Sequence, residues 1–119
     1  MHKGRKISGG KYIKSRKKKA YEKVGQKKLP KLGDDKRKTA RVRGGNVKVI
    51  LLKGKTVNVM TKNRMQKTEI KNVLETPSNR FLARQNVITK GTIVQTDIGK
   101  VRITNRPTQE GILNGVLVE

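Results

Sequence analysis

The chain has 119 residues, of which 31 are Lys or Arg and eight are Asp or Glu, giving a formal net charge of +23. A soluble chain with this imbalance repels itself unless a polyanion neutralises it, so nucleic acid is the first partner to consider and an anionic membrane the second. The lack of Cys excludes disulfides and thiolate metal sites, and one His, His2, cannot supply a zinc site or a His-based triad.

No apolar run approaches the roughly 18 residues that span a bilayer. The N-terminus is basic but lacks the apolar segment of a signal peptide. We therefore expect a protein of a reducing, cytoplasmic compartment with no membrane partner.

The charge is unevenly spread along the chain. Residues 1–45 hold 18 Lys and Arg with three acids, whereas residues 46–119 hold 13 with five acids and most of the apolar residues. The first part cannot bury enough apolar surface to offset its ordering entropy. The sequence therefore predicts a basic, extended RNA-binding arm over residues 1–45, disordered when free, and a β-barrel domain over residues 46–119.

The arm begins with a mixture of cations and glycines over Gly4–Lys11. Glycine lets the backbone approach a phosphate, but the spacing is not that of a P-loop, since Tyr12 follows Lys11. Weak helical periodicity over Lys11–Gly25 predicts a helix that forms against RNA. Tyr12 and Tyr21 fit base stacking and amphipathic anchoring equally well.

The end of the arm carries a proline, an acidic pair and a basic stretch. Pro30 favours an extended conformation before it. Asp34-Asp35 could form a magnesium site, but a local charge balance or the cap of a helix over Lys36–Ala40 is favoured. The basic stretch Lys36–Asn46 ends on Gly44 and Gly45, which we expect to bend the arm into the barrel.

Strands are predicted throughout the second part, where 17 of 27 apolar residues are Val or Ile. Val47–Leu51 and Val57–Val59 alternate around Lys53-Gly54-Lys55, which predicts a hairpin. Thr61–Lys67 is polar and predicts a loop. Thr68–Glu75 predicts a third strand with Ile70 and Val73 on opposite faces.

A turn or short helix is predicted next, over Thr76–Arg80, with Thr76 as its cap and Pro77 at its first position. Arg80 and Arg84 would then share a face. Phe81 and Leu82 are expected to turn inward, with base stacking as the alternative role of Phe81.

The remaining strands are predicted over Val87–Thr89, Thr92–Thr96, Lys100–Asn105 and Ile112–Val118. Asp97-Ile98-Gly99 has the form of a three-residue hairpin loop. Arg106-Pro107 ends the alternation that points Val101 and Ile103 inward. The fold class expected is mainly β: a small antiparallel barrel of about six strands with a long basic N-terminal extension and little helix.

Several ordered blocks resemble the family of small-subunit ribosomal protein eight, of the archaeal and eukaryotic type. They are Gly4-Arg5-Lys6, Ser8-Gly9-Gly10-Lys11, Lys31-Leu32-Gly33, Arg41-Val42-Arg43-Gly44-Gly45-Asn46, Pro77-Ser78-Asn79-Arg80, Thr89-Lys90-Gly91, Gly99-Lys100 and Arg106-Pro107. The chain is short, as in the archaeal form, and Thr108 stands where a glycine would be expected. The resemblance implies a β-barrel whose basic extension lies on small-subunit ribosomal RNA, without enzymatic activity.

The expected partners are small-subunit ribosomal RNA and neighbouring ribosomal proteins, with the protein in the cytoplasm as part of the ribosome. No small-molecule substrate, cofactor, catalytic residue or metal site is predicted. Cations that neutralise phosphates, with the glycines and the tyrosine that accompany them, are the predicted RNA contacts: Lys3, Arg5, Lys6, Lys11, Tyr12, Arg16, Lys17, Lys18, Lys19, Lys31, Lys36, Arg37, Lys38, Arg41, Arg43, Gly44, Gly45, Asn46, Arg80, Arg84, Lys90 and Arg106.

Other functions fit the sequence less well. A DNA-binding architectural or chromatin protein is the alternative, but the chain shows neither a recognition-helix pattern nor an apolar wedge. A nuclease would need paired carboxylates that the spacing does not provide. A membrane-surface peptide would need an apolar helix face that the arm lacks.

Overall fold

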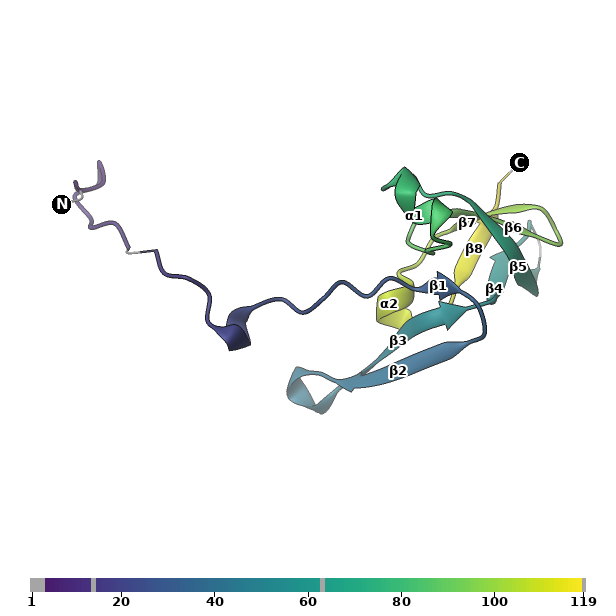
Figure 1. Cartoon of the computed structure of the whole chain (residues 1–119), viewed down its shortest axis with the longest axis horizontal. Helices are drawn as coiled ribbons and strands as arrows, with labels where there is room; N and C mark the ends of the chain where they lie inside the picture. The colour runs from purple at the N-terminus through teal and green to yellow at the C-terminus, as the bar shows by residue number, and fades with distance from the viewer. Residues whose placement is uncertain (1–3, 14, 63, 119) are drawn as a thin grey trace.

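The computed structural model describes residues 4–13, 15–62 and 64–118. A folded body, which begins at Pro30, carries a long N-terminal extension (Figure 1). The extension comprises the described residues before Pro30 and runs away from the body. The radius of gyration is 20.5 Å and the extents are 66 × 33 × 29 Å. A compact chain of this length would have a radius of gyration of about 13–14 Å. The extension accounts for the difference.

The extension makes little regular structure of its own. Among the described residues of Lys11–Gly25 only a 3₁₀ helix, η1 (Ala20–Glu22), forms. The apolar side chains that suggested a longer helix have nothing to pack against, with Ile13 91% and Val24 90% exposed. Helix stability in proteins comes mostly from packing an apolar face, so an unpartnered segment stays extended.

The first sheet has three strands in the order β1-β3-β2, formed by β1 (Lys31–Leu32), β2 (Lys36–Arg41) and β3 (Val47–Gly54). The helix expected over Lys36–Ala40 is therefore wrong, because this stretch pairs antiparallel with β3. β2 and β3 lie on either side of residue 45, where the sequence predicted the end of the arm, so the two predicted parts share this sheet. The predicted folding of the two parts in isolation stays a prediction.

The hairpin predicted between Val47–Leu51 and Val57–Val59 is also wrong. β3 pairs with β1 and β2, and the chain continues through Lys55 into β4 (Thr56–Met60), which belongs to a second sheet. Gly54 is buried at this passage, and a Cβ there would lie 2.9 Å from Leu51 Cδ2. The glycine thus serves close packing rather than a hairpin turn.

The second sheet is a closed barrel in the order β4-β5-β6-β7-β8, which confirms the predicted fold class. Its further strands are β5 (Met65–Glu75), β6 (Ile93–Thr96), β7 (Lys100–Ile103) and β8 (Asn114–Leu117). Four pairings are antiparallel, and the barrel closes through a parallel pairing of β4 with β8. Closure leaves no unpaired edge of the kind that promotes aggregation.

The long strand β5 differs from simple alternation. Ile70 and Val73 are both buried, at 3% and 5% exposure, although an ideal strand would place them on opposite faces. The register against β6 shifts between Ile70 and Asn72 and again between Val73 and Glu75. The first of these shifts, a β-bulge that lies between Ile70 and Val73, turns both side chains into the core and corrects the prediction of opposite faces.

Two short helices connect the barrel strands. α1 (Arg80–Arg84) is capped by Asn79, whose side chain accepts a hydrogen bond from the Phe81 N–H, rather than by Thr76 as predicted. α2 (Pro107–Glu110) begins on its proline and ends at Gly111, which has φ +74. The segment expected as a strand over Val87–Thr89 makes only one isolated bridge, from Val87 to Lys31.

The core is aliphatic. Its buried cluster consists of Leu51, Val57, Val59, Ile70, Val73, Ile88, Val94, Val101, Ile103 and Leu113. Val101 and Ile103 point inward from β7 as predicted, but Phe81 is 60% exposed, so its prediction as a core residue is wrong. Among the described residues, no helix is long and apolar enough to cross a membrane.

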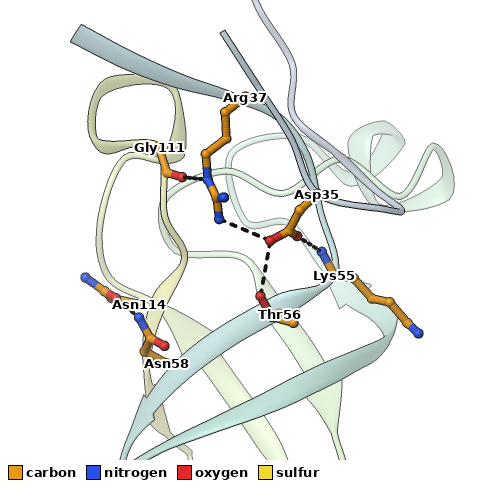
Figure 2. A network of polar contacts seen from close by, with 7 residues as sticks. All are labelled: Asp35, Arg37, Lys55, Thr56, Asn58, Gly111 and Asn114. Atoms are coloured by element: carbon orange, nitrogen blue, oxygen red, sulfur yellow. Dashed lines mark hydrogen bonds and ion pairs between the residues drawn. The ribbon is translucent and has the colours of Figure 1, made fainter. Parts of the chain in front are cut away.

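A polar network joins the first sheet to the barrel (Figure 2). The Asp35 carboxylate accepts hydrogen bonds from the Lys55 N–H at 3.0 Å and from Arg37 at 3.1 Å. Arg37 Nε also donates to the Gly111 carbonyl at 2.8 Å, beyond the end of α2. Asp35 is thus a local charge balance, one of the two favoured predictions, while its other predicted role as a helix cap is wrong.

Replacing Asp35 should destabilise the body. We expect Asp35→Ala to lower the free energy of unfolding by about 1–2 kcal/mol, because Arg37 and the Lys55 N–H lose a charged acceptor. The measurement is chemical denaturation of the full chain. Asp34→Ala is the matched control, since Asp34 makes no hydrogen bond or ion pair among the described residues, and its effect should stay within about 0.5 kcal/mol. Equal effects of the two variants would contradict the role of the network.

Candidate nucleic-acid interface

The predicted contacts on the extension are all exposed and spread along its length, namely Arg5, Lys6, Lys11, Tyr12, Arg16, Lys17, Lys18 and Lys19. Lys3 was also predicted and lies outside the described residues. A small turn holds the first of these residues. The backbones of Arg5 and Lys11 form an isolated antiparallel β-bridge, and the Arg5 guanidinium donates a hydrogen bond to the Gly9 carbonyl at 3.2 Å. Gly9 has φ +76, so its backbone uses the conformation that glycine tolerates best.

One cation of the extension is paired with an acid. Arg16 makes two hydrogen bonds to the Glu22 carboxylate, at 2.7 and 2.6 Å, and the Lys19 N–H makes a third at 3.0 Å. The Arg16 hydrogen bond, followed by that of the Lys19 backbone, lowers the pKa of Glu22, and the same pairing raises the pKa of Arg16. Through this Arg16–Glu22 fork, the Glu22 carboxylate joins Arg16 and the Lys19 N–H to the single turn of η1.

The Arg16–Glu22 fork should be visible in a titration. Because the pairing favours the ionised carboxylate, we expect Glu22 to titrate below its ordinary value of 4.5. The interaction is present above that ordinary pKa and is lost as the pH falls through the lowered one. NMR titration of the Glu22 side chain measures this, with Arg16→Gln as the control that moves the midpoint back up. An unchanged midpoint in the Arg16→Gln variant would contradict the fork.

The β2–β3 hairpin forms a second group of predicted contacts. Lys36, Lys38 and Arg41 lie exposed on β2, and Arg43 follows in the turn. The turn is closed by a 2.8 Å hydrogen bond from the Val42 N–H to the Asn46 carbonyl. Gly44 and Gly45 have φ +78 and +77, so they reverse the chain at the hairpin tip. The tip therefore presents cations beside an open glycine backbone.

Two of the predicted RNA contacts, Lys31 and Arg37, lie on strands of the first sheet. Lys31 lies on β1, paired with Lys53 on one side and bridged to Val87 on the other through the backbone, and its side chain is exposed. Arg37 uses its guanidinium to hold Asp35 and the Gly111 carbonyl. Charge density alone could not distinguish this structural arginine from its neighbours.

The barrel displays a third group. Arg80 and Arg84 on α1, Lys90 in the following turn and Arg106 before α2 are exposed and make no ion pair within the described part of the chain. By contrast, Lys55 and Lys71 pair with Glu69 and Asp97, each at 2.7 Å. The hydrogen bond to Glu69 raises the pKa of Lys55.

Further exposed cations were absent from the predicted set. They share an outward position without an acidic partner among the described residues: Lys23, Lys27, Lys28, Lys48, Lys53, Arg64, Lys67, Lys100 and Arg102. The outward alternation of Lys100 and Arg102 along their strand was visible in the sequence and could have added these two. The others lie outside the densest basic runs, which is why the sequence ranked them low.

These features define a class: a small basic β-barrel protein with a cationic N-terminal extension. The chain matches the family described as ribosomal protein S8e over residues 1–118. It is 47% identical over 118 residues to the small ribosomal subunit protein eS8 of Staphylothermus marinus, covering 97% of this chain and 92% of that protein. The proteins of the same name from Nanoarchaeum equitans and Pyrobaculum aerophilum are 44% and 46% identical, covering 95% and 97% of this chain and 91% of each relative. The chain belongs to the ribosomal protein S8e family, as the resemblance implied.

Proposed function

We propose that this protein is a structural component of the small ribosomal subunit that binds and stabilises folded small-subunit ribosomal RNA. It works in the cytoplasm as part of the ribosome, beside neighbouring ribosomal proteins, and catalyses no reaction. The observation that carries the proposal is the exposed extension, whose cations stand away from the body and, apart from Arg16, have no acidic partner among the described residues. Family membership supplies the setting.

The extension suits a folded RNA because several phosphate-lined helices can surround a slender chain. Lys and Arg neutralise phosphates and release counterions, and this release favours binding strongly at low salt. The side chains of the described residues 4–29 are almost all exposed, so the extension gains little from its own packing and depends on a partner for order. The hairpin tip and the barrel cations add contacts at the end where the extension joins the body.

Membership of the subunit is tested by sedimentation of the native protein through a high-salt sucrose gradient. We expect the protein to travel with small subunits, because all the contacts distributed along the extension must be broken before the protein is released. A protein that stays at the top of the gradient at every salt concentration would contradict the proposal.

The nature of the nucleic acid is tested by competition. At moderate salt, protein-free small-subunit ribosomal RNA should displace the chain from labelled RNA far more effectively than duplex DNA of equal phosphate concentration. If duplex DNA competes equally well, a DNA-binding architectural protein becomes the better assignment.

A further inference from the structure

Every aromatic side chain of this protein lies on its surface. The chain has one Phe, two Tyr and no Trp, and Tyr12, Tyr21 and Phe81 are 55%, 78% and 60% exposed. Aromatic residues normally dominate a protein core because they bury the most apolar area. Here Val, Ile and Leu fill the core without them. The three rings are therefore available for contacts outside the chain.

Each ring also has a cation beside it. The Lys6 and Lys19 ammonium groups lie 5.9 and 6.0 Å from the ring centres of Tyr12 and Tyr21, and the Arg84 guanidinium lies 5.8 Å from that of Phe81. An unpaired base binds proteins by stacking on an aromatic ring or a guanidinium plane, while a nearby cation meets its phosphate. Each of the three pairs supplies both an aromatic ring and a cation.

Phe81 is the ring held on the folded body. Ala83 packs against the core, and because a helix turns about 100° per residue, Phe81 two positions earlier lies on the opposite side. The Asn79 side chain accepts a hydrogen bond from the Phe81 N–H at 3.0 Å, and this bond fixes the first turn of α1. Arg84 comes from the last turn of the same helix. The outward position of Phe81 thus follows from the way α1 is anchored.

We propose that Phe81 and Arg84 form a stacking site for one unpaired base of RNA. The proposal rests on the proposed function, since it assumes that the chain binds RNA. The base must be unpaired because a base within an A-form helix has both faces covered by its neighbours. Arg80, exposed on the same helix and without an ion pair among the described residues, is placed to meet a phosphate beside that base.

A single tryptophan can report on this site, because the chain contains none. In the full-length Phe81→Trp variant, titration with protein-free small-subunit ribosomal RNA should quench the indole emission, since stacking against a base quenches it. The control is Ile98→Trp on the β6–β7 turn, beside Asp97, which is paired with Lys71. Its emission should stay unchanged while the RNA binds to the same extent.

An affinity series tests the same site without a reporter. Phe81→Leu keeps an apolar side chain but removes the aromatic face, and Phe81→Tyr keeps the face. We expect Phe81→Leu to weaken RNA binding by roughly 5- to 150-fold and Phe81→Tyr to bind as the native chain does. Circular dichroism of both variants confirms that the exposed position leaves the fold intact.

The outcomes separate this site from the proposed function. If the native chain fails to bind the RNA at all, the proposed function fails. If the RNA binds but the Phe81→Trp emission is unchanged and Phe81→Leu binds normally, the stacking site is overturned and the function stands. An emission change that occurs only when other ribosomal proteins are added would mean that Phe81 meets a protein instead, and this result would also overturn the proposal.

Discussion

Removing residues 1–28 should reduce the affinity for small-subunit ribosomal RNA on the order of a thousandfold or more at low salt. The deletion removes 12 of the 31 Lys and Arg residues. If half of them contact phosphates, the slope of log affinity against log salt concentration should become shallower by about 4 to 5. Filter binding or fluorescence anisotropy at several salt concentrations measures both quantities.

The deletion should leave the body folded. The side chains of the described residues before Pro30 are exposed apart from that of Glu22, which is half-buried, whereas Pro30 is buried and its carbonyl accepts a hydrogen bond from the Ile88 N–H at 2.8 Å. We expect the free energy of unfolding to change by about 0.5 kcal/mol or less. A cut at residue 45 would instead remove both strands that pair with β3, and we expect it to disrupt the first sheet.

Charge and length can be separated with a matched variant. Replacing six lysines with Gln keeps the extension complete while removing six charges: Lys17, Lys18, Lys19, Lys23, Lys27 and Lys28. Its salt slope should lie between those of the native and shortened chains. If the shortened chain binds as tightly as the native one, with an unchanged slope, the extension is not the RNA-binding segment.

Gly115→Ala should be among the most destabilising single methyl additions in the barrel. A Cβ at this position would lie 2.4 Å from Val101 Cγ1 and 2.9 Å from the Arg102 carbonyl oxygen. Neither neighbour is the free end of a flexible side chain, so the β7–β8 pairing must separate. We expect a loss of roughly 3 kcal/mol in the free energy of unfolding, the upper end of the usual cost of overpacking.

Chemical denaturation measures this loss, and two further variants make the test specific. Gly25→Ala is the control, because nothing lies within 4 Å of a Cβ there and the backbone is unstrained; its effect should be within about 0.5 kcal/mol. Adding Val101→Ala to Gly115→Ala should recover only part of the loss, since the carbonyl contact remains. A Gly115→Ala chain as stable as the native one would show that β8 does not pack as described.

The strands that the sequence predicted best are those with a clean alternation and a short loop. Val101 and Ile103 alternate with cations on β7, and the preceding three-residue loop ends at Gly99, whose φ is +143. Such local signals determine both the strand and its partner β6. Strand β8 was also predicted, over Ile112–Val118, and the observed strand, Asn114–Leu117, is shorter at both ends.

The errors arose where a distant partner decides the structure. Lys36–Ala40 has no strong strand signal of its own, and it becomes a strand because β3 offers an unpaired edge. The β-bulge that turns Ile70 and Val73 to one side likewise depends on β6. Phe81 was expected inside on hydrophobicity alone, but the five-residue α1 packs through Ala83, so the larger ring is left outside.

For the candidate interface too, the sequence predicted some features and missed others. Composition and charge runs located the cations, since nearly all of them are exposed. They could not reveal that Arg37 is engaged by Asp35, two positions away, and by Gly111, 74 positions away, because charge runs carry no information about such contacts. Which cations remain available is a property of the folded body rather than of the basic runs.

The closing of the barrel has a consequence for the order of events during synthesis. β4 pairs with β8, where Asn58 lies beside Asn114, 56 positions further along the chain, so the barrel cannot close until β8 has been synthesised. Chains emerge from the N-terminus onward, and pairings distant in sequence form late. The cationic extension is therefore exposed while the body is still unclosed. A nascent chain can thus meet a polyanion before its own fold is finished, and the last strand determines when the body becomes rigid.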